Sequence, residues 1–297
     1  MCHALNLFII KNNPLKILTN LILYCILIIS YILKKLQMQS LGLIKASLRG
    51  FSVLITGGGS GIGLSTAELF AEMNANVAIN YLPSDKGSYE RINLLSKKFS
   101  NIHAFPGDIS NAEVAERVIL QTYKKFKCLN FLINNVGIGL VKKPIPFDKL
   151  NKIDDKFWNQ IMQVNLMSAF YCSRASAKYL KEKKGAIVNV TSISSSGKRG
   201  TSIPYAVSKG SLNTLTRSLA KSLAPDVRVN AVSPGFTITN MTKQRSKSHK
   251  EKMAKQTLLE RNAKPKEIAE IIFMLCVSGS FVTGEIINVD GGHGYIY

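Results

Sequence analysis

From about residue 47 onwards, short apolar runs alternate with longer segments in which apolar residues recur every three or four positions. The short runs predict buried strands, and the longer segments predict helices with one apolar face. The predicted strands are 53–55, 76–81, 102–105, 129–133, 186–190, 227–232 and 285–289. The predicted helices are 63–73, 88–99, 112–126, 157–183, 205–223 and 264–275. This alternation predicts one α/β domain over 47–297, with a parallel sheet covered by helices on both faces.

The first 46 residues do not follow this pattern, because segment 15–33 is an almost continuous apolar run with lysines on both flanks. About 20 apolar residues cross a bilayer, so the run predicts a hydrophobic N-terminal helix and a candidate membrane anchor beside a cytoplasmic domain. No small-residue cleavage site follows it, which argues against a removable signal peptide. Lysines on both sides leave the orientation unspecified. The alternative is that residues 1–37 do not belong to the natural product and that translation starts at Met38.

The segment from Thr56 to Gly63, TGGGSGIG, lies between the first predicted strand and the first predicted helix. Glycines let the backbone turn sharply, and they let a phosphate approach main-chain N–H groups that no Cβ shields. The N-terminus of the following helix adds a partial positive charge at the same place. A simple glycine turn between core elements is the alternative. The agreement of spacing, strand and helix favours a dinucleotide-binding site.

A second group of polar residues lies between Ser192 and Lys209. Tyr205 and Lys209 are four positions apart, so on a helix they share one face. An ammonium beside a phenol favours the phenolate and would lower the tyrosine pKa, which suits a general acid or base. Ser192 follows the predicted strand 186–190, at the end of a strand where open α/β sheets bind ligands. Taken alone, a surface Tyr–Lys pair and a turn serine are the simpler interpretations.

From about Leu48 to Gly292, the order and spacing of several segments resemble the short-chain dehydrogenase/reductase family. The matching segments are TGGGSGIG (56–63), GDIS (107–110), NNVG (134–137), Asn165, the set Ser192, Tyr205 and Lys209, VNAVSPG (229–235) and FVTGEIINVDGG (281–292). The resemblance implies a single Rossmann-type doubly wound parallel sheet, here preceded by the hydrophobic N-terminal helix. It also implies an NAD(P)-dependent oxidoreductase that moves a hydride between nicotinamide and a carbonyl or alcohol group.

The resemblance also assigns roles to individual side chains. Tyr205 donates or accepts the proton, and Ser192 holds the substrate oxygen. Lys209 binds the nicotinamide ribose and lowers the pKa of Tyr205, while Asn165 keeps a water in a proton relay. The residues implied at the cofactor are Thr56, Gly57, Ser60, Gly61, Ile62, Gly63, Tyr81, Asp108, Ile109, Asn135, Gly137, Tyr205, Lys209, Pro234, Gly235 and Thr237.

The end of the second predicted strand carries the signal for the choice of cofactor. An acidic residue there would bind the ribose hydroxyls of NAD and repel the extra phosphate of NADP. The chain reads Asn80-Tyr81-Leu82 at this point, with no acid before Asp85. We therefore expect NADP(H) to be preferred, with NAD(H) as the alternative. Ser60 occupies a position where many NADP-using relatives have a basic residue, so Lys86 is the candidate for that role.

The resemblance leaves the substrate open. The best-populated similar group is the 3-oxoacyl-[acyl-carrier-protein] reductases, followed by sugar, polyol and aldehyde reductases. A reductase of lipid-like ketones is a further alternative, motivated by segment 15–33. A non-catalytic NADP-binding protein is the alternative of a different class, and the presence of Tyr205 and Lys209 argues against it. Relatives are homo-oligomers, so a tetramer is expected, with helices 157–183 and 205–223 at the interface.

The formal net charge is +21, from 39 Lys and Arg against 18 Asp and Glu. Such a charge can attract nucleic acid, anionic lipid or acidic proteins. No nucleic-acid motif is present, so a lysine-rich solvated surface is the simpler interpretation. The five Cys and four His show no metal-ligand spacing, and no metal or disulfide framework is expected.

In the family, the segment after Gly235 is a lid over the substrate, and here it is basic. Either it is a solvated helix, or it attracts an anionic substrate or an acidic carrier protein.

Overall fold

The computed structural model describes residues 47–139, 145–197, 200–293 and 295. Over this part of the chain, seven strands form one sheet in the order β3-β2-β1-β4-β5-β6-β7, and every neighbouring pair is parallel. The strands are β1 (Ser52–Ile55), β2 (Asn76–Tyr81), β3 (Ile102–Pro106), β4 (Phe131–Asn134), β5 (Ala186–Val190), β6 (Arg228–Pro234) and β7 (Ile286–Val289). The strand order reverses between β1 and β4, which is where open α/β sheets bind ligands.

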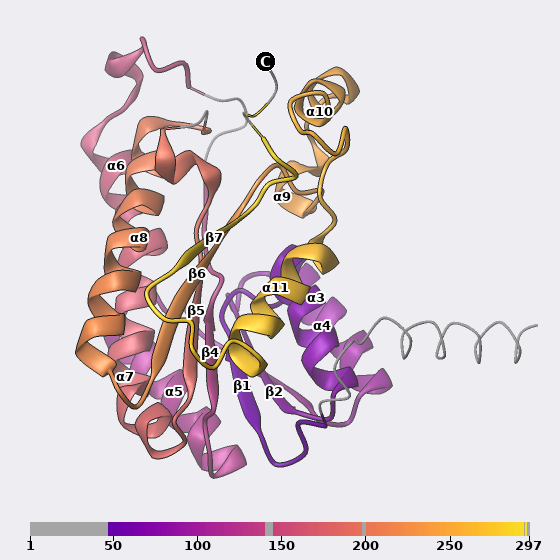
Figure 1. The fold of residues 1–297 in the computed structure, drawn as a ribbon, viewed down its shortest axis with the longest axis vertical. Coiled ribbons are helices and arrows are strands. Elements are labelled where there is room, and N and C mark those ends of the chain that lie inside the picture. The colour runs from indigo at the N-terminus through magenta and orange to yellow at the C-terminus, as the bar shows by residue number, and fades with distance from the viewer. Residues whose placement is uncertain (1–46, 140–144, 198–199, 294, 296–297) are drawn as a thin grey trace, which may run out of the picture. The chain divides into compact units, whose positions relative to one another are not determined.

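Helices cover both faces of this sheet (Figure 1). One layer contains α5 (Ala112–Phe126), α6 (Asp155–Met162), α7 (Ser168–Glu182) and α8 (Ile203–Leu223). The other contains α3 (Gly61–Glu72), α4 (Lys86–Lys98) and α11 (Pro265–Val277). Two short helices, α9 (Asn240–Lys243) and α10 (Lys247–Ala254), lie beyond the carboxyl end of β6. The sheet and its two layers confirm the predicted Rossmann-type fold.

The core forms where the central strands meet these helices. All residues of β1, β4 and β5 are buried, as expected for strands covered on both faces. On one side, Leu54, Leu132 and Ile187 belong to a buried cluster shared with α5, α7 and α8. On the other side, the ring of Phe70 lies 5.1 Å from that of Phe273, joining α3 to α11. Apolar packing on both faces therefore holds the central strands in place.

Most predicted strands and helices agree with the structure to within one or two residues. The helix predicted over 157–183 is helical from Asp155 to Glu182, but a π-helical turn over Gln163–Met167, which the sequence did not predict, divides it into α6 and α7. A π turn holds one more residue than an α turn and is common at functional sites. Apolar spacing continues through the turn, so periodicity could not reveal it. The buried residue of this turn is Asn165.

The predicted N-terminal helix and candidate anchor over 15–33 lie outside the described residues, as does the whole extension 1–46. Ser47 to Tyr297 form one compact unit. Within the part of the chain that the structure describes, no helix has both the length and the apolar character needed to span a bilayer.

Candidate active site

The carboxyl ends of the parallel strands open into a large cleft. Its volume is about 1120 Å³, and its walls come from the glycine turn, the ends of β2, β4, β5 and β6, the start of α8 and the lid helices. Most predicted site residues line it: Gly57, Ser60, Gly61, Ile62, Tyr81, Asp108, Ile109, Asn135, Gly137, Ser192, Tyr205, Lys209, Pro234, Gly235 and Thr237. Thr56, Gly63 and Asn165 do not line it and lie in the layer behind.

Ser192 and Tyr205 are brought together by the ends of two elements. Ser192 follows β5 and caps a short 3-10 helix, accepting a hydrogen bond from the Ser194 N–H at 3.2 Å. Tyr205 lies in the first turn of α8, where the buried Ser202 side chain accepts from its N–H at 3.4 Å. The Ser192 hydroxyl donates to Ser194 Oγ at 3.1 Å, and Ser192 lies near enough to Tyr205 to lower the pKa of its phenol. Both side chains line the same cleft.

Lys209 lies one turn after Tyr205 on the same face of α8. Its side chain is buried, and its ammonium donates to the Val190 carbonyl oxygen at 2.8 Å. Burial lowers the pKa of this lysine to about 8. Gly137 leaves room for the ammonium, since a Cβ there would lie 3.0 Å from Nζ. The charge is thus held at the bottom of the cleft between β4 and β5.

Burial raises the pKa of Tyr205, and the neighbouring Ser192 opposes this only in part. The ammonium of Lys209 is bonded to the Val190 carbonyl. The expectation that Lys209 lowers the pKa of Tyr205 stays a prediction. Sharing a helix face brings two side chains near each other, but it does not decide which partner each one takes.

Asn165, in the π turn, is held by the main chain of Ile138 and by α8. Its Oδ1 accepts from the Ile138 N–H at 2.8 Å, and its Nδ2 donates to the Ile138 carbonyl and to Ser208 Oγ, both at 3.0 Å. These bonds join the loop after β4 to the helix that carries Tyr205. The predicted role of holding a water stays a prediction.

The glycine turn forms a cradle against the end of β4. Gly57 and Gly61 have φ of +60° and +53°, a conformation that other residues rarely adopt. Asn135 Nδ2 donates to the carbonyls of Thr56 and Gly57, both at 3.0 Å. A Cβ at Gly63 would lie 2.6 Å from that amide nitrogen, so only glycine fits. Thr56 and Gly63 therefore shape the turn from behind.

The N-terminus of α3 faces the cleft from this cradle. Its N-cap, Ser60, makes no side-chain capping bond, so the first N–H groups of the helix are not satisfied by that side chain. Main-chain donors and the helix dipole together bind anions. The residues therefore fit the diphosphate of a dinucleotide.

The outer end of the cleft is shaped by the ends of β2 and β3. Asn80 Nδ2 donates to the carbonyls of Phe105 and Gly107, at 3.1 and 3.0 Å, which fixes the turn before Asp108. Asp108 accepts from the Ser110 N–H at 3.0 Å, and Ile109 is buried behind it. Asp108 and Ile109 line the cleft here, where the family resemblance implies the adenine end of the cofactor.

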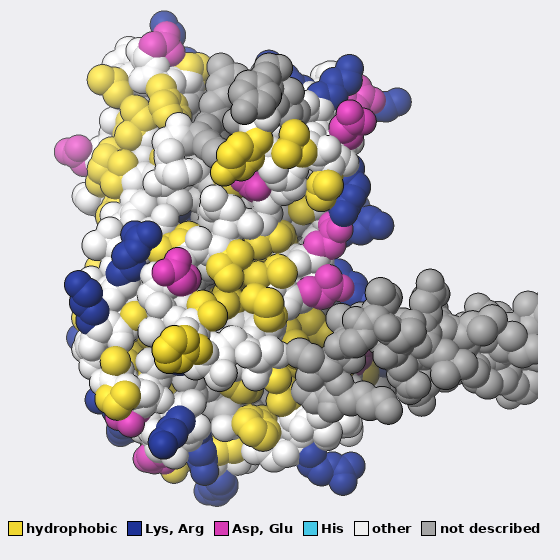
Figure 2. Space-filling view, viewed as in Figure 1, with side chains coloured by type: hydrophobic (Ala, Val, Ile, Leu, Met, Phe, Trp, Pro, Cys, Tyr) yellow, Lys and Arg dark blue, Asp and Glu magenta, His cyan; other side chains and the backbone are white. Residues whose placement is uncertain are grey.

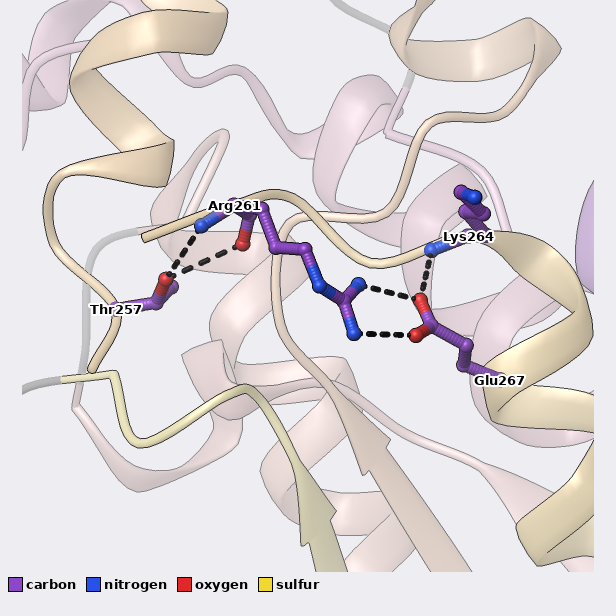
Figure 3. Close-up of polar contacts among 4 residues, drawn as sticks. All are labelled: Thr257, Arg261, Lys264 and Glu267. Atoms are coloured by element: carbon purple, nitrogen blue, oxygen red, sulfur yellow. Dashed lines mark hydrogen bonds and ion pairs between the residues drawn. The ribbon is translucent and has the colours of Figure 1, made fainter. Parts of the chain in front are cut away.

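The segment 238–262, which the family resemblance predicts as the lid, has its two ends joined at its base. Thr237 and Ala263 form an isolated parallel bridge, and the Ile238 N–H donates to the Ala263 carbonyl at 2.9 Å. Arg261 donates to the carboxylate of Glu267 in α11 through its two terminal nitrogens, Nη1 and Nη2, at 2.9 and 2.6 Å (Figure 3). Glu267 also accepts from the Lys264 N–H at 2.7 Å, so one carboxylate holds the lid end and caps the helix.

The structure also places residues at the cleft that the sequence did not reveal. His249 of α10 and His293 line it, and no motif or spacing in the sequence marks either one. The pKa of His249 is lowered by partial burial and by the cations Arg245 and Lys252. Among the described residues, no cluster of His, Cys, Asp and Glu could hold a metal ion.

The chain is similar to known oxidoreductases over most of its length. The family model described as enoyl-(acyl carrier protein) reductase matches residues 57–294. An uncharacterized oxidoreductase of Thermotoga maritima is 36% identical over 259 residues, which are 83% of this chain and 98% of that protein. The 3-oxoacyl-[acyl-carrier-protein] reductase FabG of Aquifex aeolicus is 32% identical, over 82% of this chain and 98% of that protein.

Solved structures agree with these sequence relatives. A short-chain dehydrogenase/reductase from Brucella melitensis superposes with a TM-score of 0.76 at 32% identity, over 84% of this chain and 98% of that one. A short chain dehydrogenase from Burkholderia cenocepacia, in complex with NADP, gives 0.75 at 26% identity, over 83% and 98%. With this fold, this cleft and these relatives, the chain belongs to the short-chain dehydrogenase/reductase family of NAD(P)-dependent oxidoreductases that act on alcohol and carbonyl groups.

Proposed function

We propose that the chain reduces a 3-oxoacyl thioester, most like a 3-oxoacyl-[acyl-carrier-protein] reductase. The observation that carries the proposal is the convergence of Ser192, Tyr205 and Lys209 on one wall of a cleft that also holds the glycine cradle. The FabG relative from Aquifex aeolicus, with 98% of its length matched, supports this substrate class. Bound nicotinamide supplies the hydride.

In this proposal, Tyr205 and Ser192 act on the substrate oxygen. The Ser192 hydroxyl orients the carbonyl, and Tyr205 gives the proton to the oxygen as it becomes an alcohol. A tyrosine whose pKa is raised by burial is protonated at neutral pH, which suits the direction of reduction. Lys209 would hold the nicotinamide ribose, and Asn165 keeps the loop after β4 and helix α8 in register.

We propose a preference for NADP(H), with NAD(H) as the alternative. The neutral end of β2, Asn80-Tyr81-Leu82, supports it because no acid there repels a ribose phosphate. The solved relative from Burkholderia cenocepacia is a complex with NADP.

The charge of the lid favours an acidic carrier protein as the source of the substrate. Between Asn240 and Gln256 the single acid is Glu251, against six basic residues: Lys243, Arg245, Lys247, Lys250, Lys252 and Lys255. Arg245 and Lys252 line the cleft as well. A cationic rim steers an anionic partner toward the opening and loses this effect as salt rises.

A homo-oligomer, expected to be a tetramer, completes the proposal. Figure 2 shows apolar side chains in the middle of the face that carries β7 and α11, with Lys and Arg scattered around them. Phe281, just before the edge strand β7, is fully exposed. The edge strand of a sheet presents unpaired N–H and C=O groups with which another chain can pair. Light scattering should give a tetramer, and Phe281→Asp should reduce its mass; a monomeric wild type would contradict the proposal.

The substrate is tested with one panel at fixed cofactor. It contains acetoacetyl-[acyl-carrier-protein], acetoacetyl-coenzyme A, a simple aldehyde, a keto sugar and a lipid-like ketone, each with NADPH and NADH, and follows nicotinamide absorbance. We expect the carrier-linked thioester to have the highest kcat/KM and the steepest fall with salt. Faster turnover of the sugar, aldehyde or lipid-like ketone would reject the 3-oxoacyl assignment, and no turnover of any compound would favour a non-catalytic binding protein.

A further inference from the structure

At the outer end of the cleft, a cation lies directly behind the lining residues. The wall there includes Gly59, Ser60, Tyr81, Asp85 and Ser88, and none of these is basic. Behind them lies Arg91, in the second turn of α4. Its guanidinium contacts the glycine turn and the start of its own helix, so it connects two segments of the cleft wall.

Two hydrogen bonds fix the position of this guanidinium. Arg91 Nε donates to the Gly59 carbonyl at 2.7 Å, and Nη2 donates to Ser88 Oγ at 3.1 Å. A Cβ at Gly87 would lie 3.0 Å from Nη1, so the absence of a side chain there lets the guanidinium lie close to the backbone. A guanidinium has five N–H donors, and these two bonds use two of them.

Asp85 is the acid at this end of the cleft, and its carboxylate is directed to its own helix. One oxygen accepts from the Ser88 N–H at 2.9 Å and the other from Ser88 Oγ at 2.6 Å. These bonds lower its pKa, with a smaller contribution from the charge of Arg91. A carboxylate occupied in this way is less able to bind the two ribose hydroxyls of NAD, which is the usual function of an acid in this region.

We propose that Arg91, connected through Ser88 to Asp85, selects a cofactor that carries a phosphate on its adenosine ribose. The guanidinium offsets the charge of Asp85 and keeps N–H donors for the phosphate oxygens, to which it is well matched. The inference rests on the proposed use of NADP(H) and names the residue responsible for it. In this proposal Arg91 takes the role for which the sequence suggested Lys86, a residue that is exposed at the start of α4.

The test measures nucleotide binding and needs no substrate. Wild type, Arg91→Met and Lys86→Met are titrated with NADPH and NADH, following the fluorescence of the reduced nicotinamide. We expect Arg91→Met to weaken NADPH binding about tenfold, the loss of one charge-assisted contact, and to change NADH binding less than about twofold. Lys86→Met, a matched loss of one positive charge on the same helix, should leave both within about twofold.

A second pair of probes isolates the adenosine end. 2′-Phospho-ADP-ribose and ADP-ribose compete with NADPH and differ in one phosphate, so Arg91→Met should weaken the first alone. Arg91→Lys, which keeps the charge but loses the planar fork, should fall between wild type and Arg91→Met. If Arg91→Met does not fold, Arg91→Lys with the same two probes decides the question.

Equal losses for both nucleotides would mean that Arg91 only supports the fold, and this would overturn the proposal. A selective loss in Lys86→Met, or no loss in Arg91→Met, would overturn it as well. Wild type that binds neither nucleotide would reject the oxidoreductase function itself, and the inference with it. A substrate panel without carrier-linked activity leaves these titrations unaffected, so the two failures are distinguishable.

Discussion

The glycine cradle and the lid are both parts of the cleft wall, but they are held in different ways. The cradle is bound to the sheet by buried hydrogen bonds, such as those from Asn135 to the carbonyls of Thr56 and Gly57. The lid is tied to the domain mainly at its base, and its helix α10 has no fully buried residue. In the proposed function, the cofactor would bind at the cradle, which buried hydrogen bonds hold in place, and the substrate would bind at the lid, where side chains can change at little structural cost.

The largest expected effect comes from Tyr205→Phe, at the point where the two regions meet. Turnover should fall by about 10²-fold or more, because the hydroxyl moves the proton. NADPH affinity should change by no more than a few-fold, because the ring still fills its place. Steady-state kinetics and fluorescence titration measure the two. Tyr171→Phe, on α7 and outside the cleft, is the control, and near-normal activity of Tyr205→Phe would reject the assignment.

The rigidity of the cradle is tested by Gly63→Ala. The added methyl would lie 2.6 Å from Asn135 Nδ2 and 2.7 Å from the Gly57 carbonyl oxygen, so the backbone must shift. We expect a loss of about 1–3 kcal/mol in the free energy of unfolding, together with weaker nucleotide binding. Gly210→Ala is the control, since its Cβ meets only Ser195 O at 3.5 Å. Equal denaturation midpoints for Gly63→Ala and wild type would show that the cradle is not tightly packed.

The buried Lys209 makes stability depend on pH. Its pKa is about 8 in the folded state against an ordinary 10.5, so between these values the unfolded chain holds more protons. Stability from this group therefore rises with pH from about 8 to about 10.5, and below 8 the cost of the buried charge is fully present. The free energy of unfolding in urea is measured for wild type and for Lys209→Met across this pH range. The difference between the two should show that rise.

Lys221→Met, an exposed position on the same helix, is the control for this pH series. Its difference from wild type should stay constant over the same range. A constant difference for Lys209→Met as well would mean that this ammonium is solvated and that the bottom of the cleft is open to water.

The smallest effect is expected at the base of the lid. Glu267→Gln removes the bidentate pair with Arg261, whose side chains are 33% and 50% exposed, so stability should fall by less than about 1 kcal/mol. KM for the carbonyl substrate should rise a few-fold while NADPH affinity is unchanged, because the lid contacts the substrate. Glu270→Gln on the same helix is the control. A change in NADPH affinity with constant KM would show that the pair supports the cradle instead.

The sequence predicted the parts of the molecule that depend on backbone geometry. Strands such as 76–81 and 186–190 were predictable because buried parallel strands are mostly apolar and short. Gly57 and Gly61 were predictable because few other residues adopt their φ values. The partner of Lys209 was not predictable, since a helix face brings side chains together without assigning their bonds. Arg91 and His249 were missed for a related reason: tertiary packing brings His249 to the cleft and Arg91 to the back of its wall, and such packing leaves no periodic signal.

The bridge between Thr237 and Ala263 has a consequence for how such enzymes diversify. Because the two ends of the lid meet there, the segment between them is a loop whose closure entropy depends only weakly on its length. A replacement of residues 238–262 would leave β6, β7 and α11 in place. We therefore expect that changes within residues 238–262 alter this wall of the cleft and leave the residues proposed for hydride transfer in place.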